Sequence, residues 1–275
     1  MTRAHNDFGD DLSLAHVLAD AADAISMSRF RAMDLRVESK PDMTPVTDAD
    51  KAVEESIRAS LSRARPRDAV LGEEFGGSDP YTWRGNRQWI IDPIDGTANF
   101  VRGVPIWATL IALFAGGQPV VGLVSAPALG RRWWAALGHG AYAGRNVTHA
   151  SRLHVSGVNR FSDASFCYSD LGGWQQKGKL DGMLSLIGRS WRSRAYGDFY
   201  GYMLLAEGAL EVMVEPELSL WDVAALITIV NEAGGRFTDL CGQPSPGNGS
   251  AVATNGPLHD DVLDALGDPA STGLR

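Results

Sequence analysis

The stretch that most constrains the fold is an apolar strand that runs directly into a turn with two acids. Residues 88–91, Gln-Trp-Ile-Ile, have the composition of a buried strand, and Asp-Pro-Ile-Asp-Gly-Thr follows at residues 92–97. Ligands of layered α/β folds bind where strands end, so this turn predicts a site at a sheet edge. Pro93 stiffens the turn, and the carboxylates of Asp92 and Asp95 can converge on one point.

The chemistry of this turn suits both a cation and an anion. Carboxylate oxygens are the ligands of hard cations such as Mg²⁺. Gly96 and Thr97 are expected to open a helix, whose free N–H groups would bind an anion such as phosphate. The alternative is an ordinary turn, in which the Asp and Gly residues cap a helix and bind no ligand.

Acids at two other element ends weaken that alternative. Glu73 and Glu74 follow a short expected strand at residues 69–71, and Asp222 lies at the start of an apolar helix expected over residues 221–233. Alone, the Glu pair would be a solvated acidic turn, and Asp222 would be an ordinary first-turn acid. Together with Asp92 and Asp95, they predict that acids from separate elements gather in one pocket.

Helical and strand patterns alternate along the whole chain of 275 residues, which predicts a mixed α/β fold of stacked layers. We expect an N-terminal lobe at residues 1–150, which holds the metal and phosphate motifs, and a C-terminal lobe at residues 151–275. Residues 38–45 and 76–86 are expected to be loops. Helices are expected over residues 11–33, 48–62, 180–187, 198–207, 221–233 and 258–266.

Composition narrows the function classes. Hydrophobic residues make up 44% of the chain, which is enough apolar surface for a folded core. The net charge of −8 argues against a general nucleic-acid partner, because phosphate binding requires basic residues. No apolar run reaches the length of a membrane helix and no signal peptide is evident, so no membrane partner is expected. The two cysteines form no CxxC motif, which favours reduced thiols and a cytoplasmic location.

These motifs resemble those of the inositol monophosphatase superfamily. The resemblance is carried by residues 72–74, 89–100, 221–225 and 232–235 and extends over roughly residues 12–265. It implies an αβαβα layered sandwich of the inositol monophosphatase and fructose bisphosphatase type. It also implies an Mg²⁺-dependent, lithium-sensitive phosphomonoesterase that acts on a small-molecule phosphate ester and forms a homodimer.

The resemblance also implies a role for each acid of the motifs. Two or three Mg²⁺ ions would bind in each site, and Mn²⁺ could replace them. The implied metal ligands are Glu73, Asp92 and the Ile94 carbonyl for the first ion, Asp92, Asp95 and Asp222 for the second, and Glu73 with Asp50 through water for a weaker third.

Catalytic and substrate-binding roles follow from the same resemblance. Thr97 and Glu73 would orient and deprotonate a water molecule, with Asp50 nearby. The phosphate would be held by Gly96 and Thr97. The implied substrate-binding residues are Gly96, Thr97, Asp95, Asp198, Glu215 and the loop lysine Lys40.

The segment that contacts the leaving group favours a cationic substrate. Asp198 and the bulky Phe199 follow Gly197, where inositol-specific members carry small residues. Together with Glu215, this pattern resembles the bacterial histidinol-phosphate phosphatases of the superfamily. Histidinol phosphate carries an ammonium group and an imidazole, and two acids would bind these cations by charge-assisted hydrogen bonds.

Three alternatives remain at this level. Asp198 could simply cap the helix that follows it. The chain could be an inositol-1-monophosphatase or a broad-specificity sugar phosphatase such as a fructose-1,6-bisphosphatase. It could also be a non-catalytic regulator that keeps the fold, although all the metal-binding acids are present.

Overall fold

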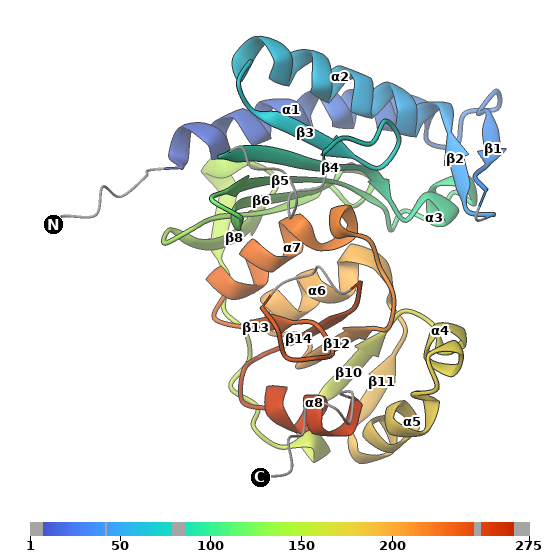
Figure 1. The fold of residues 1–275 in the computed structure, drawn as a ribbon, viewed down its shortest axis with the longest axis vertical. Coiled ribbons are helices and arrows are strands. Elements are labelled where there is room, and N and C mark those ends of the chain that lie inside the picture. The colour runs from blue at the N-terminus through green and yellow to red at the C-terminus, as the bar shows by residue number, and fades with distance from the viewer. Residues whose placement is uncertain (1–7, 42, 79–85, 245–248, 267–275) are drawn as a thin grey trace, which may run out of the picture.

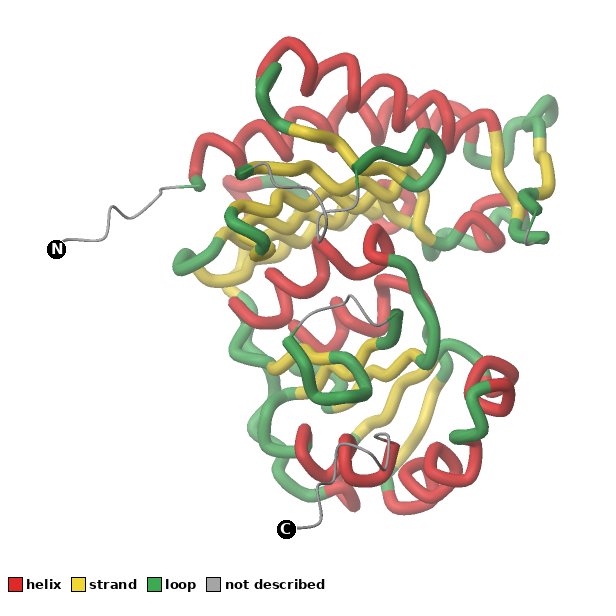
Figure 2. The backbone as a smooth tube through the Cα atoms, in the orientation of Figure 1, coloured by secondary structure: helices red, strands yellow, loops and turns green. Residues whose placement is uncertain are grey.

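The computed structural model is a stack of alternating helix and sheet layers (Figure 1). Helices α1 (Gly9–Arg29) and α2 (Asp48–Ala64) cover the outer face of a seven-stranded sheet. Helices α6 (Asp198–Ala206) and α7 (Leu220–Glu232) lie between this sheet and a five-stranded one. The backbone trace shows the same succession, which is the αβαβα sandwich that the family resemblance implied (Figure 2). The structure describes residues 8–41, 43–78, 86–244 and 249–266.

The seven-stranded sheet brings two strand ends to the same edge. Its order is β3-β4-β5-β6-β7-β8-β9, and only its first pair, β3 with β4, is parallel. Because parallel strands end at the same edge, the residues that follow β3 and those at the end of β4 become neighbours. The strands are β3 (Ala69–Gly72), β4 (Arg87–Asp95), β5 (Ala108–Ala115), β6 (Gln118–Ala126), β7 (Arg131–Ala136), β8 (Gly140–Gly144) and β9 (Ala150–Arg152).

The five-stranded sheet has the order β11-β10-β12-β14-β13. Strand β10 pairs in parallel with β11 and β12, whereas β14 pairs antiparallel with β12 and β13. Its outer face is covered by α4, α5 and α8 (Figure 1). The bounds are β10 (Ser165–Tyr168), β11 (Arg192–Arg194), β12 (Val212–Glu215), β13 (Arg236–Thr238), β14 (Ala251–Thr254), α4 (Leu171–Gln176), α5 (Leu180–Arg189) and α8 (His259–Leu266). The remaining short elements are α3 (Thr97–Val101) and 3₁₀ turns at Pro127–Leu129, Val147–His149 and Phe161–Asp163.

The central helix layer explains why α7 is apolar on every side. Eight consecutive residues of α7, from Val223 to Val230, are buried, because one face packs on the first sheet and the other on α6 and the second sheet. A helix that is hydrophobic all round is expected in such a position. This packing fixes the start of α7 against the end of β4. No helix among the described residues is both long and apolar enough to cross a bilayer.

Several predicted boundaries were wrong for local reasons. Residues 38–45 are not entirely loop, since β1 (Val37–Ser39) and β2 (Pro45–Thr47) pair as an antiparallel hairpin. The first helix ends at Arg29 rather than residue 33, and Arg31 has the left-handed φ of 61°. Strands β8 and β9 and helix α4 were missed, because glycines and polar residues hide their pattern. Part of the loop expected at residues 76–86 lies outside the described residues. The lobe boundary near residue 150 stays a prediction.

A buried histidine beside the five-stranded sheet predicts that the folded protein loses stability in acid. His259 is fully buried, and its ring nitrogens lie 2.9 Å from Thr238 Oγ1 and 3.0 Å from Thr254 Oγ1. Burial, aided by Arg236, lowers the pKa of His259 from 6.5 to about 4. The unfolded chain therefore binds a proton that the folded chain does not. The stabilisation is complete above pH 6.5 and is lost as the pH falls toward 4.

We expect the free energy of unfolding to fall by about 1 kcal/mol between pH 7 and pH 5 through this group. Urea unfolding at several pH values would measure the loss. The variant His259→Gln keeps hydrogen-bonding atoms but does not titrate, so its pH dependence should be shallower by that amount. An equally steep dependence in the variant would contradict the assignment to His259.

Candidate functional site

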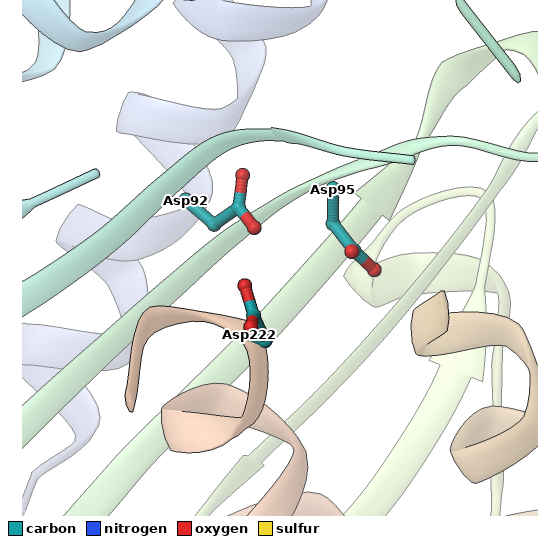
Figure 3. A group of neighbouring side chains, drawn as sticks. All are labelled: Asp92, Asp95 and Asp222. Carbon is teal, nitrogen blue, oxygen red and sulfur yellow. The ribbon is translucent and has the colours of Figure 1, made fainter. Parts of the chain in front are cut away.

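Three aspartates from distant parts of the chain meet at the edge of the first sheet. Asp92 and Asp95 lie at the end of β4, and Asp222 lies in the first turn of α7. Each offers a carboxylate oxygen, and these atoms all lie within 4.8 Å of one another. Figure 3 shows the Asp222 carboxylate directed toward Asp92, with Asp95 beside them. The sequence predicted this convergence from the separate motifs.

Backbone hydrogen bonds hold two of these carboxylates in place. Oδ2 of Asp222 accepts from the Ser219 N–H at 2.6 Å, the backbone half of a capping box at the start of α7. Oδ2 of Asp95 accepts from the Phe199 N–H at 2.7 Å, which ties β4 to the start of α6. The pairing of β4 with β5 shifts register between Asp92 and Asp95. Such an irregularity redirects side chains at a strand end.

The donor set fits a hard divalent cation. Asp92 is 2% exposed, and its Oδ1 has no hydrogen-bond partner among the described residues. Burial, then repulsion from neighbouring carboxylates, Glu73 first, raises the pKa of Asp92 well above its usual range. Burial and nearby acids likewise raise the pKa of Asp222 to about 7. An oxygen-only cluster whose charges repel one another is stabilised by a bound cation.

Glu73 is near this cluster but is bound by a lysine. Its Oε1 accepts from Lys40 Nζ at 2.6 Å, and the same ammonium binds Glu74 Oε1 at 2.6 Å. Lys40 lies in the turn between β1 and β2, so the hairpin missed by the sequence prediction delivers it to the site. The Glu73 N–H donates to Ile91 O at 3.2 Å, which fixes the turn after β3 beside β4.

A buried acid of α2 supports the turn that carries Glu73. Oε2 of Glu54 accepts from the Glu74 N–H at 2.8 Å, and Oε1 accepts from Arg58 at 2.7 Å. A Cβ at Gly72 would lie 2.0 Å from Glu54 Oε1, so only glycine leaves room for this carboxylate. Glu54 therefore holds the Glu-Glu turn from behind.

Thr97 connects two further predicted residues. Its hydroxyl lies 2.9 Å from the Ile94 carbonyl and 3.2 Å from Asp50 Oδ1, and its single proton can go to either. Asp50 belongs to the capping box of α2, in which its Oδ2 accepts from the Thr47 N–H at 2.8 Å. Burial raises the pKa of Asp50. Gly96 precedes Thr97 with φ of 84°, a left-handed conformation that favours glycine.

A cavity of about 560 Å³ opens beside Gly96 and Thr97. Its lining includes the predicted Lys40, Glu73, Gly96, Thr97, Asp198 and Asp222. Glu215 is held beside the acids by the Tyr202 hydroxyl, which donates to its Oε2 at 2.6 Å. Burial, with repulsion from Asp222 and Asp198, raises the pKa of Glu215 to about 8.

Asp198 does not cap the helix that follows it. The N-cap of α6 is Gly197, Asp198 is already the first residue of the helix, and the N-cap position makes no side-chain hydrogen bond. Oδ2 of Asp198 accepts from Asn99 Nδ2 at 3.1 Å. The capping alternative is therefore wrong, and the Asp198 side chain is directed toward α3.

Comparison with known proteins agrees with this geometry. The sequence pattern of the Inositol monophosphatase family matches residues 11–267. The protein belongs to the inositol monophosphatase family. A solved inositol monophosphatase from Zymomonas mobilis superposes with a TM-score of 0.82 at 31% identity, over 95% of this chain and 99% of that chain.

Two similar proteins have names that specify a substrate. A histidinol-phosphatase from Streptomyces coelicolor is 64% identical, over 94% of this chain and 98% of the relative. A histidinol-phosphatase from Mycobacterium tuberculosis is 57% identical, again over 94% of this chain and 98% of the relative.

Three residues of this site were not predicted from the sequence. Glu54 lies next to the apolar positions of α2. This position is a detectable signal, because an acid on a buried helix face needs a hydrogen-bonding partner. Asn99 belongs to the motif at residues 89–100, but its position there gives no sign of its partner. Tyr202 lies within an apolar helix and looks like any core aromatic.

Proposed function

We propose that the chain hydrolyses L-histidinol phosphate to L-histidinol and phosphate, a step of histidine biosynthesis. Its family and its two histidinol-phosphatase relatives make it a phosphoric monoester hydrolase. The observation that carries the choice of substrate is the 64% identity to one such relative over nearly the whole chain. The acids of the cavity support the same choice.

We propose that two or three Mg²⁺ ions occupy the acidic cluster, with Mn²⁺ able to replace them. Asp92, Asp95 and Asp222 would hold one ion, and Glu73, Asp92 and the Ile94 carbonyl another. A third would bind near Glu73 and Asp50. When bound, such ions activate a water molecule and stabilise the leaving oxygen of an in-line displacement.

The chain's own residues would position the reactants. The N–H groups of Gly96 and Thr97, at the start of α3, would hold the phosphate at the floor of the cavity. The Thr97 hydroxyl would orient the attacking water and pass a proton toward Glu73 or Asp50. Phosphoryl transfer requires mainly such positioning and charge neutralisation, so no protein nucleophile is needed.

Asp198, Glu215 and Lys40 would decide which ester binds. Asp198 and Glu215 lie on one side of the cluster, where the ammonium and imidazole of histidinol would lie and would favour the charged form of both carboxyl groups. Each charge-assisted contact contributes about 1.5–3 kcal/mol. Lys40 would approach the phosphate from the β1–β2 hairpin. A homodimer and a cytoplasmic location also remain proposals.

A substrate panel tests the proposal. With Mg²⁺ present, we expect kcat/KM for histidinol phosphate to exceed that for inositol 1-phosphate and fructose 1,6-bisphosphate at least tenfold. Each contact to a cationic leaving group that the other two esters lack corresponds to about a tenfold loss. Phosphate release would be measured for all three esters, with Li⁺ as inhibitor. A higher value for inositol 1-phosphate would mean that the substrate assignment is wrong.

A further inference from the structure

Asn99 connects the phosphate side of the site to the acid expected to bind the leaving group. Its Nδ2 donates to Asp198 Oδ2 at 3.1 Å and to the Ile106 carbonyl at 2.9 Å. Asn99 lies in α3 and comes from the first half of the chain, whereas Asp198 opens α6 in the second half. Asn99 is not among the residues that line the cavity, but Asp198 is.

Two hydrogen bonds cross between the same pair of segments in opposite directions. Asn99 donates to Asp198, and the neighbouring Phe199 N–H donates to Asp95 at 2.7 Å. Each segment thus supplies one donor and one carboxylate to the other. A Cβ at Gly96 would lie 3.3 Å from Asp198 Oδ2, so this oxygen lies close to the glycine that precedes α3.

Asp198 needs such an anchor, because its position is unfavourable in two ways. Its φ is 47°, a left-handed conformation that costs a residue other than glycine some backbone energy. Its carboxylate also lies close enough to Asp95, Asp222 and Glu215 to raise the pKa of all three by repulsion. Free rotation would carry it away from these acids. The Asn99 amide is a neutral donor that opposes this movement.

We propose that Asn99 is a positioning residue that determines specificity: its amide binds one oxygen of Asp198, so that the other oxygen is available to a cationic group of the substrate. Oδ1 of Asp198 accepts no hydrogen bond from the part of the chain that the structure describes. An amide suits this task, since it holds a carboxylate without neutralising the charge that attracts the substrate. This inference rests on the proposed function.

A double-mutant cycle tests the inference with the full-length protein and Mg²⁺. The variants are Asn99→Ala, Asp198→Ala and the double variant, and the substrates are histidinol phosphate and p-nitrophenyl phosphate, whose leaving group carries no cation. We expect Asn99→Ala to lower kcat/KM for histidinol phosphate about tenfold, mainly through KM. The loss for p-nitrophenyl phosphate should stay within twofold. In the Asp198→Ala background, Asn99→Ala should change neither value more than twofold.

Control variants separate positioning from a general loosening of the motif. Thr109 Oγ1 donates to Pro93 O at 2.8 Å, so Thr109→Val also removes a tether of the turn but leaves Asp198 alone. It should affect both substrates equally. If Asn99→Ala does not fold, Asn99→Asp retains the shape without the donor, and we expect a loss for histidinol phosphate of more than tenfold.

Two results would overturn the inference alone: equal losses on both substrates in the Asn99 variants, or full additivity with Asp198→Ala. A wild-type enzyme that hydrolyses histidinol phosphate no better than p-nitrophenyl phosphate would overturn the proposed function, and the inference with it. The wild-type panel therefore distinguishes the two failures before any variant is measured.

Discussion

Replacing Asp92 by Asn is expected to abolish phosphatase activity, with a loss in kcat/KM of at least about 10³-fold. Asp92 is the most deeply placed acid of the cluster, and its Oδ1 has no hydrogen-bond partner among the described residues. It is also the acid that the first two proposed metal positions share. The Asn side chain has the same shape but carries no charge, so the cation affinity of both positions falls together.

The same variant should be more stable than the wild type when Mg²⁺ is withheld. The neutral Asn side chain relieves the cost of burying a carboxylate and the repulsion from its neighbours, which together raise the pKa of Asp92. We therefore expect Tm to rise by about 3 °C, the effect of roughly 1 kcal/mol in a chain of this size. Saturating Mg²⁺ should reverse the order, since a ligand at a hundred times its Kd stabilises by about 2.7 kcal/mol. Thermal unfolding with EDTA and with Mg²⁺ measures both effects. An undiminished Mg²⁺ shift in the variant would exclude Asp92 as a ligand.

Short motifs predicted the acidic cluster because each one lies where an element ends. The strand before Asp92 and the apolar helix after Asp222 are both evident from hydrophobic patterning, and elements of these types have few ways to pack. The parallel pairing of β3 with β4 then brings the turn of Glu73 to the same edge. The convergence of the three aspartates could therefore be predicted mainly from where the strand ends and the helix begins.

The supporting contacts could not be predicted, because they join side chains whose partners have no sequence signature. Glu54 binds backbone groups 20 and 21 residues away, and Asn99 binds a side chain 99 residues away. The hairpin that carries Lys40 contains two prolines and charged residues, which hide a strand pattern. The helix-capping interpretation of Asp198 failed for the same reason, since its carboxylate is bound by the Asn99 amide, 99 residues away in the sequence.

Replacing Thr97 by Val is expected to lower kcat by about 10²–10³-fold while KM changes little. Valine keeps the shape of the side chain, but it removes the hydroxyl that lies within reach of Asp50 Oδ1 and the Ile94 carbonyl. Loss of a positioned proton donor or acceptor costs about 10²–10⁴-fold in rate. Steady-state kinetics with histidinol phosphate would measure the change.

Thr97→Ser is the matched control, because it retains the hydroxyl and loses only a methyl group. Its kcat should stay within tenfold of the wild type.

The Val variant should also retain the Mg²⁺-induced rise in Tm, unlike Asp92→Asn, since the Thr97 side chain is not a proposed metal ligand. Loss of that rise would show that Thr97 acts by maintaining the metal site. A kcat close to the wild-type value would show that water is oriented by other groups, with Glu73 the first candidate because it lines the same cavity.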